Sequence, residues 1–153
     1  MSATPKPEDL MWEHKAIRKQ IKFLTNSLSG LSTQSSQGGV QSNQLNDQIT
    51  LYRWSLYDFR EAIRRHIDLD ERIFKIPPGS TPGVGLRGEH ETIREQLDKA
   101  ISLAENAVYN KLSNEELNKS ASDIVEVVDR VCESIVAHIA KEDRLLKKMQ
   151  KES

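Results

Sequence analysis

The sequence predicts an all-α fold: one domain that forms an antiparallel, up-down-up-down bundle of four helices. The 153 residues include 37% hydrophobic and 29% charged side chains but only 7 Gly and 5 Pro, a balance typical of one helical domain with solvated outer faces. Apolar residues recur at alternating intervals of three and four in four segments, which is the spacing of a buried helix face. Short links between long helices favour antiparallel neighbours.

The first two helices are expected at residues 7–28 and 47–76. The apolar stripe of the first helix comprises Leu10, His14, Ile17, Ile21, Leu24 and Leu28. The stripe of the second helix comprises Tyr52, Leu56, Phe59, Ile63, His66, Asp70 and Ile73. Residues 29–46 between them are rich in Ser, Gln and Gly and have little to bury. This composition predicts a flexible loop.

The last two helices are expected at residues 86–109 and 114–149. The stripe of the third helix comprises Leu86, His90, Ile93, Leu97, Ala100, Ala104 and Ala107. The stripe of the fourth helix comprises Leu117, Ala121, Ile124, Val128, Val131, Ile135, His138, Glu142, Leu145 and Met149. Residues 77–85 contain three prolines and three glycines, which predicts a second loop. Ser113, with Glu116 three residues later, predicts a capping box at the start of the fourth helix.

Every histidine of the chain falls on one of these stripes, where an aliphatic residue is otherwise expected. Asp70 follows His66 by four residues and Glu142 follows His138 by four, so each acid shares a helix face with a histidine. Burying unpaired carboxylates costs several kcal/mol each. The stripe therefore predicts a buried metal site, and its candidate ligands are His14, His66, Asp70, His90, His138 and Glu142.

The predicted topology brings these six residues together. The first histidine lies early in the first helix and the third lies early in the third helix, whereas the two histidine–acid pairs lie late in the second and fourth helices. Alternating helix directions place these four regions at one end of the bundle. An internal repeat supports this, since EHKAIRKQI at 13–21 matches EHETIREQL at 89–97, and HIDLDERIF at 66–74 resembles HIAKEDRLL at 138–146. Two similar hairpins would supply two metals with two imidazoles each.

The arrangement H…HxxxD…H…HxxxE resembles the hemerythrin-like family, the histidine-histidine-glutamate cation-binding domain, over essentially the whole chain. The resemblance implies a non-haem centre of two iron ions with an oxo or hydroxo bridge. It implies an open or water-filled position for dioxygen, hydrogen peroxide or nitric oxide. By its motif the terminal ligands are His14, His66, His90 and His138. The same motif, with the symmetry of the repeat, makes Asp70 and Glu142 the bridging ligands.

One position departs from the oxygen-carrying members of that family. They have another histidine four residues after the third-helix histidine, where this chain has Arg94. This difference argues against reversible oxygen carriage and favours a centre with more open coordination positions. Glu13 and Glu89 precede His14 and His90 directly. Each is either an extra ligand or an acceptor for an imidazole N–H, and the acceptor role is favoured. Zinc and manganese also suit such a donor set.

Four other charged residues near the motif are expected to have no part in the site. Glu71 and Asp143 follow the two acidic ligands directly and are predicted to point outward into solvent. Arg18 and Arg94 occupy equivalent positions in the repeat. Pairing with acids near the site is one possibility for them, but extension along a helix edge is the favoured interpretation.

Charge and cysteine content limit the possible partners. A formal net charge of -1 offers no field for nucleic acid, which is not expected to bind. Cys132 is the only cysteine, so an internal disulfide and thiolate metal clusters are excluded. No segment has the apolar length of a signal peptide or a membrane span. We expect a cytoplasmic protein without membrane insertion, and the sequence identifies no protein partner.

Three functions are compatible with this pattern. The first is a centre of two metal ions, iron by resemblance, that binds or reacts with a small oxidant as a sensor or protectant. The second is a homeostasis protein that binds iron or another cation without catalysis and signals through its conformation. The third is a helical interaction module with a metal-free network of imidazoles and carboxylates. The sequence leaves open whether the protein is an enzyme.

Overall fold

The computed structural model of the protein describes residues 5–36, 42–74 and 81–152. They form four helices: α1 (Pro7–Ser36), α2 (Ser42–Ile73), α3 (Thr81–Tyr109) and α4 (Asn114–Glu152). None of the described residues lies in a strand. The predicted all-α class with four helices is confirmed. No helix in the described part of the chain is both long and apolar enough to cross a membrane.

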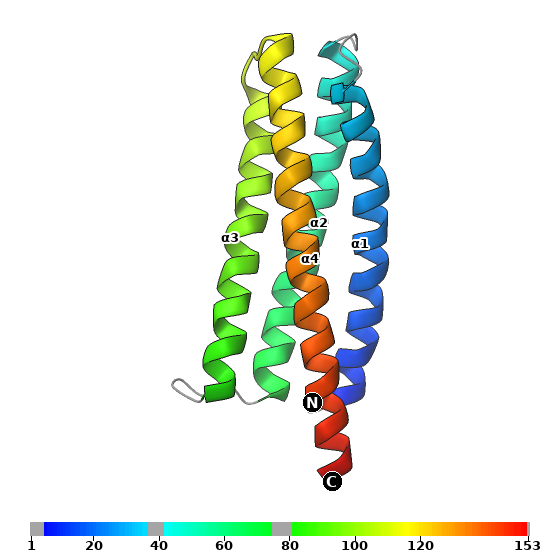
Figure 1. Ribbon diagram of the computed structural model, residues 1–153, viewed down its shortest axis with the longest axis vertical. Helices are drawn as coiled ribbons and strands as arrows, with labels where there is room; N and C mark the ends of the chain where they lie inside the picture. The colour runs from blue at the N-terminus through cyan, green and yellow to red at the C-terminus, as the bar shows by residue number, and fades with distance from the viewer. Residues whose placement is uncertain (1–4, 37–41, 75–80, 153) are drawn as a thin grey trace.

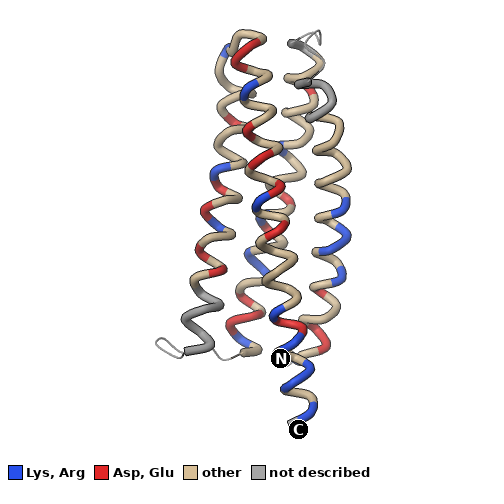
Figure 2. Tube along the Cα trace, in the orientation of Figure 1, with Lys and Arg blue, Asp and Glu red and all other residues tan. Residues whose placement is uncertain are grey.

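The four helices lie side by side along the long axis of the molecule (Figure 1). α1 contacts α2 and α4, α3 also contacts α2 and α4, and α2 meets α4 across the bundle. α1 ends and α2 begins at one end of the bundle, where α3 ends and α4 begins as well (Figure 1). The early part of α1 and α3 and the late part of α2 and α4 therefore share the opposite end. Figure 2 shows acidic and basic residues mixed along α2, α3 and α4, whereas the charged residues of α1 after Glu13 are all basic.

Much of the loop predicted at residues 29–46 is helical, so that prediction is wrong. α1 continues to Ser36 and α2 already begins at Ser42. Leu31 is 2% exposed and Leu45 is 1% exposed, so the apolar stripe of each helix continues into the Ser- and Gln-rich stretch. Burial of these two leucines offsets the weak helix propensity of their polar neighbours. The residues between the two helices lie outside the described part.

The start of α3 also differs from the prediction. α3 begins at Thr81, inside the loop expected at 77–85, and Pro82 occupies its first turn. Proline is tolerated there because the first backbone N–H groups of a helix have no partner within the helix. Residues 77–80 of that predicted loop lie outside the described residues. The ends of α2 and α4 lie within three residues of the predicted positions.

The start of α4 has the predicted capping box. The backbone N–H of Glu116 donates to the Ser113 hydroxyl at 3.1 Å, and the backbone N–H of Ser113 donates to Oε1 of Glu116 at 3.1 Å. Hydrogen bonds to Ser113 hold the pKa of the Glu116 carboxyl below its usual value. The box satisfies two backbone donors at the helix end. These bonds stabilise the first turn of α4.

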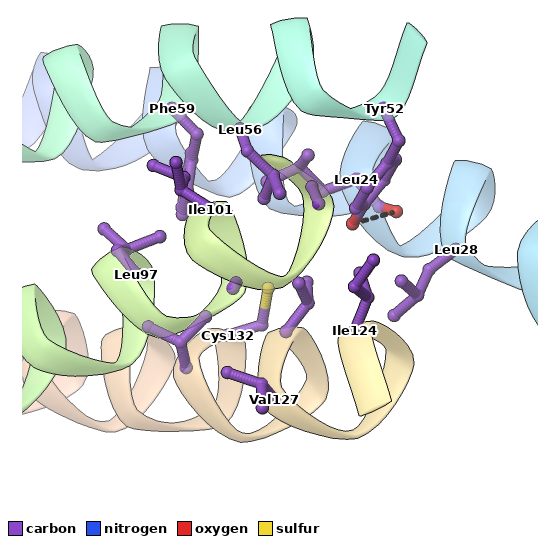
Figure 3. Close-up of a cluster of buried hydrophobic side chains, with 14 of the residues drawn as sticks. Leu24, Leu28, Tyr52, Leu56, Phe59, Leu97, Ile101, Ile124, Val127 and Cys132 are labelled. Atoms are coloured by element: carbon purple, nitrogen blue, oxygen red, sulfur yellow. Dashed lines mark hydrogen bonds between the residues drawn. The ribbon is translucent and has the colours of Figure 1, made fainter. Parts of the chain in front are cut away.

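Apolar side chains fill the bundle along most of its length, and Figure 3 shows part of this core. Tyr52 belongs to it as predicted, and its hydroxyl donates to the carbonyl of Leu24 at 3.3 Å. Cys132 is 4% exposed, and burial, with a smaller contribution from Asp129, raises the pKa of its thiol to about 11. A thiol that stays protonated is a poor nucleophile.

A second, smaller apolar cluster closes one end of the bundle. It consists of Leu10, Ile73 and Leu146. Each of these residues lies three or four positions from one of the predicted metal ligands on its own helix, which is one helical turn. The predicted ligands therefore lie between the large apolar core and this small cluster. Apolar packing on both sides keeps bulk water away from them.

Truncation of a core residue distant from the ligands is expected to lower stability without changing the site. Phe59 is 1% exposed and lies on α2 seven residues before His66, about 10 Å along the helix. Phe59→Ala should lower the free energy of unfolding in urea by about 3–5 kcal/mol because it leaves a cavity. Leu51→Ala, at a position 69% exposed on the same helix, is the control and should cost far less. Equal costs for the two variants would contradict this description of the core.

Candidate metal centre

The structure brings all six predicted ligands together in one buried layer. α1 contributes His14, α2 contributes His66 and Asp70, α3 contributes His90, and α4 contributes His138 and Glu142. None of the six is more than 2% exposed. Each helix presents its ligand on the stripe that faces the core, because the ligands keep the three- and four-residue spacing of their apolar neighbours.

The four imidazoles surround the two carboxylates through their Nε2 atoms. Oε1 of Glu142 lies 3.1 Å from Nε2 of His14, 2.9 Å from that of His66 and 3.2 Å from that of His138. Oδ2 of Asp70 lies 3.2 Å from Nε2 of His66, 3.1 Å from that of His90 and 3.1 Å from that of His138. Each carboxylate therefore has three imidazole nitrogens close to one of its oxygen atoms.

These contacts divide the six residues into two overlapping groups of four. One group consists of His14, His66, Asp70 and Glu142, and the other consists of Asp70, His90, His138 and Glu142. Within each group, one potential ligand atom of every residue lies within 4.8 Å of those of the other three. Both groups contain both carboxylates, and each has two imidazoles of its own. Each group can hold a metal ion.

The Nδ1 atoms of the imidazoles face a second ring of carboxylates. Oε1 of Glu13 on α1 lies 2.8 Å from Nδ1 of His66 on α2, and Oε2 of Glu89 on α3 lies 2.8 Å from Nδ1 of His138 on α4. A carboxylate that is ionised can only accept a hydrogen bond, so these Nδ1 atoms carry the hydrogen. Glu13 and Glu89 thus act as acceptors for imidazole N–H groups. Each serves a histidine on the neighbouring helix rather than the one beside it in sequence.

Asp143 belongs to this ring, and the prediction that it points into solvent is wrong. Its Oδ1 accepts a hydrogen bond from Nδ1 of His14 at 2.7 Å, and its Oδ2 accepts one from Arg18 at 2.6 Å. Arg18 therefore pairs with an acid of the site instead of only extending along its helix. Burial would raise the pKa of the Asp143 carboxyl, but Arg18 and His14 lower it below its ordinary value.

Glu71 and Arg94, the counterparts of this pair in the repeat, behave differently. Oε1 of Glu71 lies 3.7 Å from Nδ1 of His90, beyond hydrogen-bonding distance, and the Glu71 side chain is 38% exposed. Arg94 donates to Glu91 on its own helix at 3.3 Å. The prediction of an arginine extending along a helix edge describes Arg94 well. The Glu71 carboxylate faces His90 instead of pointing fully outward as predicted, but it accepts no hydrogen bond from that imidazole.

The outer hydrogen bonds determine what the inner faces of the imidazoles can do. A neutral imidazole with its hydrogen on Nδ1 presents a lone pair at Nε2. In this layer the Nε2 lone pairs of His14, His66 and His138 point toward carboxylate oxygens about 3 Å away. Two acceptors repel each other at that distance unless a proton or a metal cation lies between them. The layer is therefore built to hold positive charge.

Without a metal, protons supply that charge. Burial lowers the pKa of His66, but hydrogen bonds to Asp70, Glu13 and Glu142 together outweigh burial and raise it to about 11. Burial likewise lowers the pKa of His138, but Asp70, Glu142 and Glu89 raise it to about 10. Burial raises the pKa of Asp70, yet the surrounding imidazoles hold it below its ordinary value. A metal ion must displace such protons when it binds.

Three observations fit the site to a pair of divalent cations. First, Oδ1 of Asp70 and Oε2 of Glu142 are buried without a hydrogen-bond partner in the described structure, which is costly for charged oxygens unless a cation satisfies them. Second, two ligands bound at right angles about 2.1 Å from one ion lie about 3.0 Å apart, close to the observed N···O distances. Third, among the described residues six carboxylates surround the imidazoles, and only two cations, Arg18 and Lys141, pair with them. The six belong to Glu13, Asp70, Glu71, Glu89, Glu142 and Asp143. Neutral imidazoles then leave four negative charges.

Comparisons of the chain with models of protein families, with curated proteins and with solved structures found no match. The identity of the site therefore depends on its own residues and their geometry. That geometry establishes a buried cluster of histidines and carboxylates that could hold metal ions.

Proposed function

We propose that this protein is a hemerythrin-like metalloprotein that holds two iron ions and binds or reacts with a small oxidant such as dioxygen, hydrogen peroxide or nitric oxide. The observation that carries this proposal is the pair of four-residue groups that share Asp70 and Glu142. Shared carboxylates between two sets of imidazoles are the donor arrangement of a dinuclear centre, with Asp70 and Glu142 as bridges. The order of the six ligands along four helices supports the likeness to the hemerythrin-like family.

The choice of metal follows from the donors and from that likeness. Imidazole and carboxylate suit iron, manganese and zinc, and the ligand order favours iron. Each ion would receive two imidazoles and a share of two carboxylates, fewer donors than octahedral iron accepts. The positions left over suit a small ligand. A pair of iron ions would supply Lewis acidity and redox change for its binding.

The chain's own residues prepare the site for this role. Glu13, Glu89 and Asp143 orient three of the imidazoles through their Nδ1–H groups, so that each Nε2 faces inward. Apolar clusters on both sides of the layer exclude bulk water. A groove of about 440 Å³ between α1 and α4 is lined by Arg18 and Asp143 among others. Solvent therefore reaches Asp143, which accepts the hydrogen bond from His14, whereas His14 itself is buried.

Spectroscopy of iron-loaded protein tests the proposal. Protein loaded with iron(II) without oxygen should contain two iron ions per chain by elemental analysis. Its ultraviolet-visible spectrum should gain charge-transfer absorption on exposure to dioxygen, hydrogen peroxide or nitric oxide, because the oxidant reaches an open position on the iron. Zinc-loaded protein is the control and should show no change, since zinc(II) has no redox chemistry.

Two outcomes would contradict the proposal in different ways. Two bound iron ions with no spectral change from any of the three oxidants would favour a cation-binding homeostasis protein instead. Absence of bound metal after loading would favour the metal-free helical interaction module. Metal content and spectra of the same iron-loaded protein thus distinguish both alternatives from the proposed function.

A further inference from the structure

The outer hydrogen bonds differ between the two groups of ligands. In the group with His14 and His66, both Nδ1 atoms have a carboxylate partner, at 2.7 Å from Asp143 and 2.8 Å from Glu13 respectively. In the group with His90 and His138, only His138 has one, Glu89 at 2.8 Å. Nδ1 of His90 is buried without a hydrogen-bond partner in the described structure. The pseudo-twofold symmetry of the repeat is broken at this point.

The cause of the difference lies in two pairs of equivalent positions. Arg18 holds the Asp143 carboxylate at 2.6 Å while that carboxylate accepts from His14. Arg94, equivalent to Arg18, pairs instead with Glu91. Glu71, equivalent to Asp143, remains 3.7 Å from His90.

The remaining outer contacts do not reverse this difference. Lys141 lies 3.3 Å from the Glu89 carboxylate, so the acid that serves His138 is held by a cation in the same way as Asp143. The two groups are therefore matched in having one acid paired with a cation. They differ in the partner of His90.

We propose that the two metal positions have unequal affinity, and that Asp143 and Arg18 are positioning residues that make the position of His14 and His66 the tighter one. This inference rests on the proposed pair of metal ions. A hydrogen bond from the outer nitrogen fixes the orientation of an imidazole ligand and raises its basicity. Removal of such a partner typically weakens metal binding about 10- to 100-fold. The position of His90 and His138, which lacks one partner, should be weaker by a similar factor.

Titration of the intact metal-free protein with iron(II) in the absence of oxygen tests this. Two binding phases are expected, with dissociation constants that differ about 10- to 100-fold. Anomalous diffraction from crystals with one equivalent of iron should place the ion between His14 and His66. A single ion between His90 and His138 would overturn the inference. A single binding phase that contains both ions, which would mean equal affinities, would overturn it too. Failure to bind any iron would overturn the proposed function as well, so the two failures are distinguishable.

Matched variants test the roles of the positioning residues. Asp143→Ala should weaken the tighter phase about 10- to 100-fold, whereas Glu71→Ala, its equivalent in the repeat, should have a much smaller effect because Glu71 accepts no hydrogen bond from His90. Asp143→Asn keeps an oxygen that can accept from His14 and should recover part of the affinity. Arg18→Ala should weaken the tighter phase less than Asp143→Ala, and Arg94→Ala should have no effect.

The stability of the same variants without metal separates positioning from a merely structural role. The unfolding midpoint of metal-free Asp143→Ala should lie modestly below that of Glu71→Ala, because only Asp143 accepts hydrogen bonds from His14 and Arg18 and its carboxylate is partly exposed. Equal weakening of iron binding by these two variants would show that Asp143 does not position His14, and the inference would then be wrong.

Discussion

Removal of the two metal ions that we propose for the site is expected to lower the melting temperature of the protein by about 16–32 °C. An ion that binds only the folded chain, at a free concentration about 1,000 times its dissociation constant, stabilises it by about 4 kcal/mol. Two ions therefore contribute about 8 kcal/mol. In a domain of this size each kcal/mol shifts the melting temperature by about 2–4 °C. The large effect arises because the six donors come from four helices and meet only in the folded bundle.

Circular dichroism at 222 nm on heating measures this difference between iron(II)-loaded and chelator-treated protein under anaerobic conditions. Calcium, which prefers six to eight oxygen ligands, is the control cation and should leave the melting temperature of the metal-free protein unchanged. Equal melting temperatures for loaded and chelated protein would show that the layer does not bind iron in the folded state.

Asp70→Ala is expected to abolish binding of both ions, whereas His14→Ala should abolish only one. Asp70 belongs to both groups of ligands, and its Oδ2 lies within 3.2 Å of three imidazoles. Loss of a ligand to both ions should weaken binding by more than about 100-fold, since loss of an outer partner alone costs about 10- to 100-fold. His14 belongs to one group, so the other group keeps its four residues.

Elemental analysis after dialysis measures the iron that each variant retains. Asp68→Ala, which removes an exposed carboxylate two residues away on the same helix, is the matched control and should retain both ions. Helical circular dichroism of metal-free Asp70→Ala establishes that the variant is folded. Retention of two iron ions by folded Asp70→Ala would exclude a bridging role for this carboxylate.

The stripe pattern predicted the four helices and the layer of ligands because burial imposes the same spacing on apolar and ligand residues alike. His14 and Asp70 could be assigned to the core from their place among leucines and isoleucines, and the structure buries both. Composition was a weaker guide. The Ser- and Gln-rich stretch around Leu31 and Leu45 was predicted to be a loop, although two buried leucines suffice to continue the helices there.

The partner of His14 could not be predicted from a single helix. On the pattern of α4 alone, Asp143 lies beside the buried stripe, and only the approach of α1 brings His14 within 2.7 Å of it. A signal was nevertheless present in the sequence. In every helix an acid is adjacent to a ligand, as in Glu13–His14, Asp70–Glu71, Glu89–His90 and Glu142–Asp143. In the structure each outer acid faces the histidine of the next helix around the bundle.

The burial of all six ligands within long helices has a consequence for the traffic of ions. None of the six belongs to a loop, and none is more than 2% exposed. An ion bound there as proposed could enter or leave only while neighbouring helices separate transiently, a partial opening that is rarer and slower than the motion of a surface loop. Exchange of metal ions with the surrounding solution would therefore depend on this transient separation of the helices. Such a centre suits a resident cofactor that stays through many encounters with its ligand, rather than cargo for delivery.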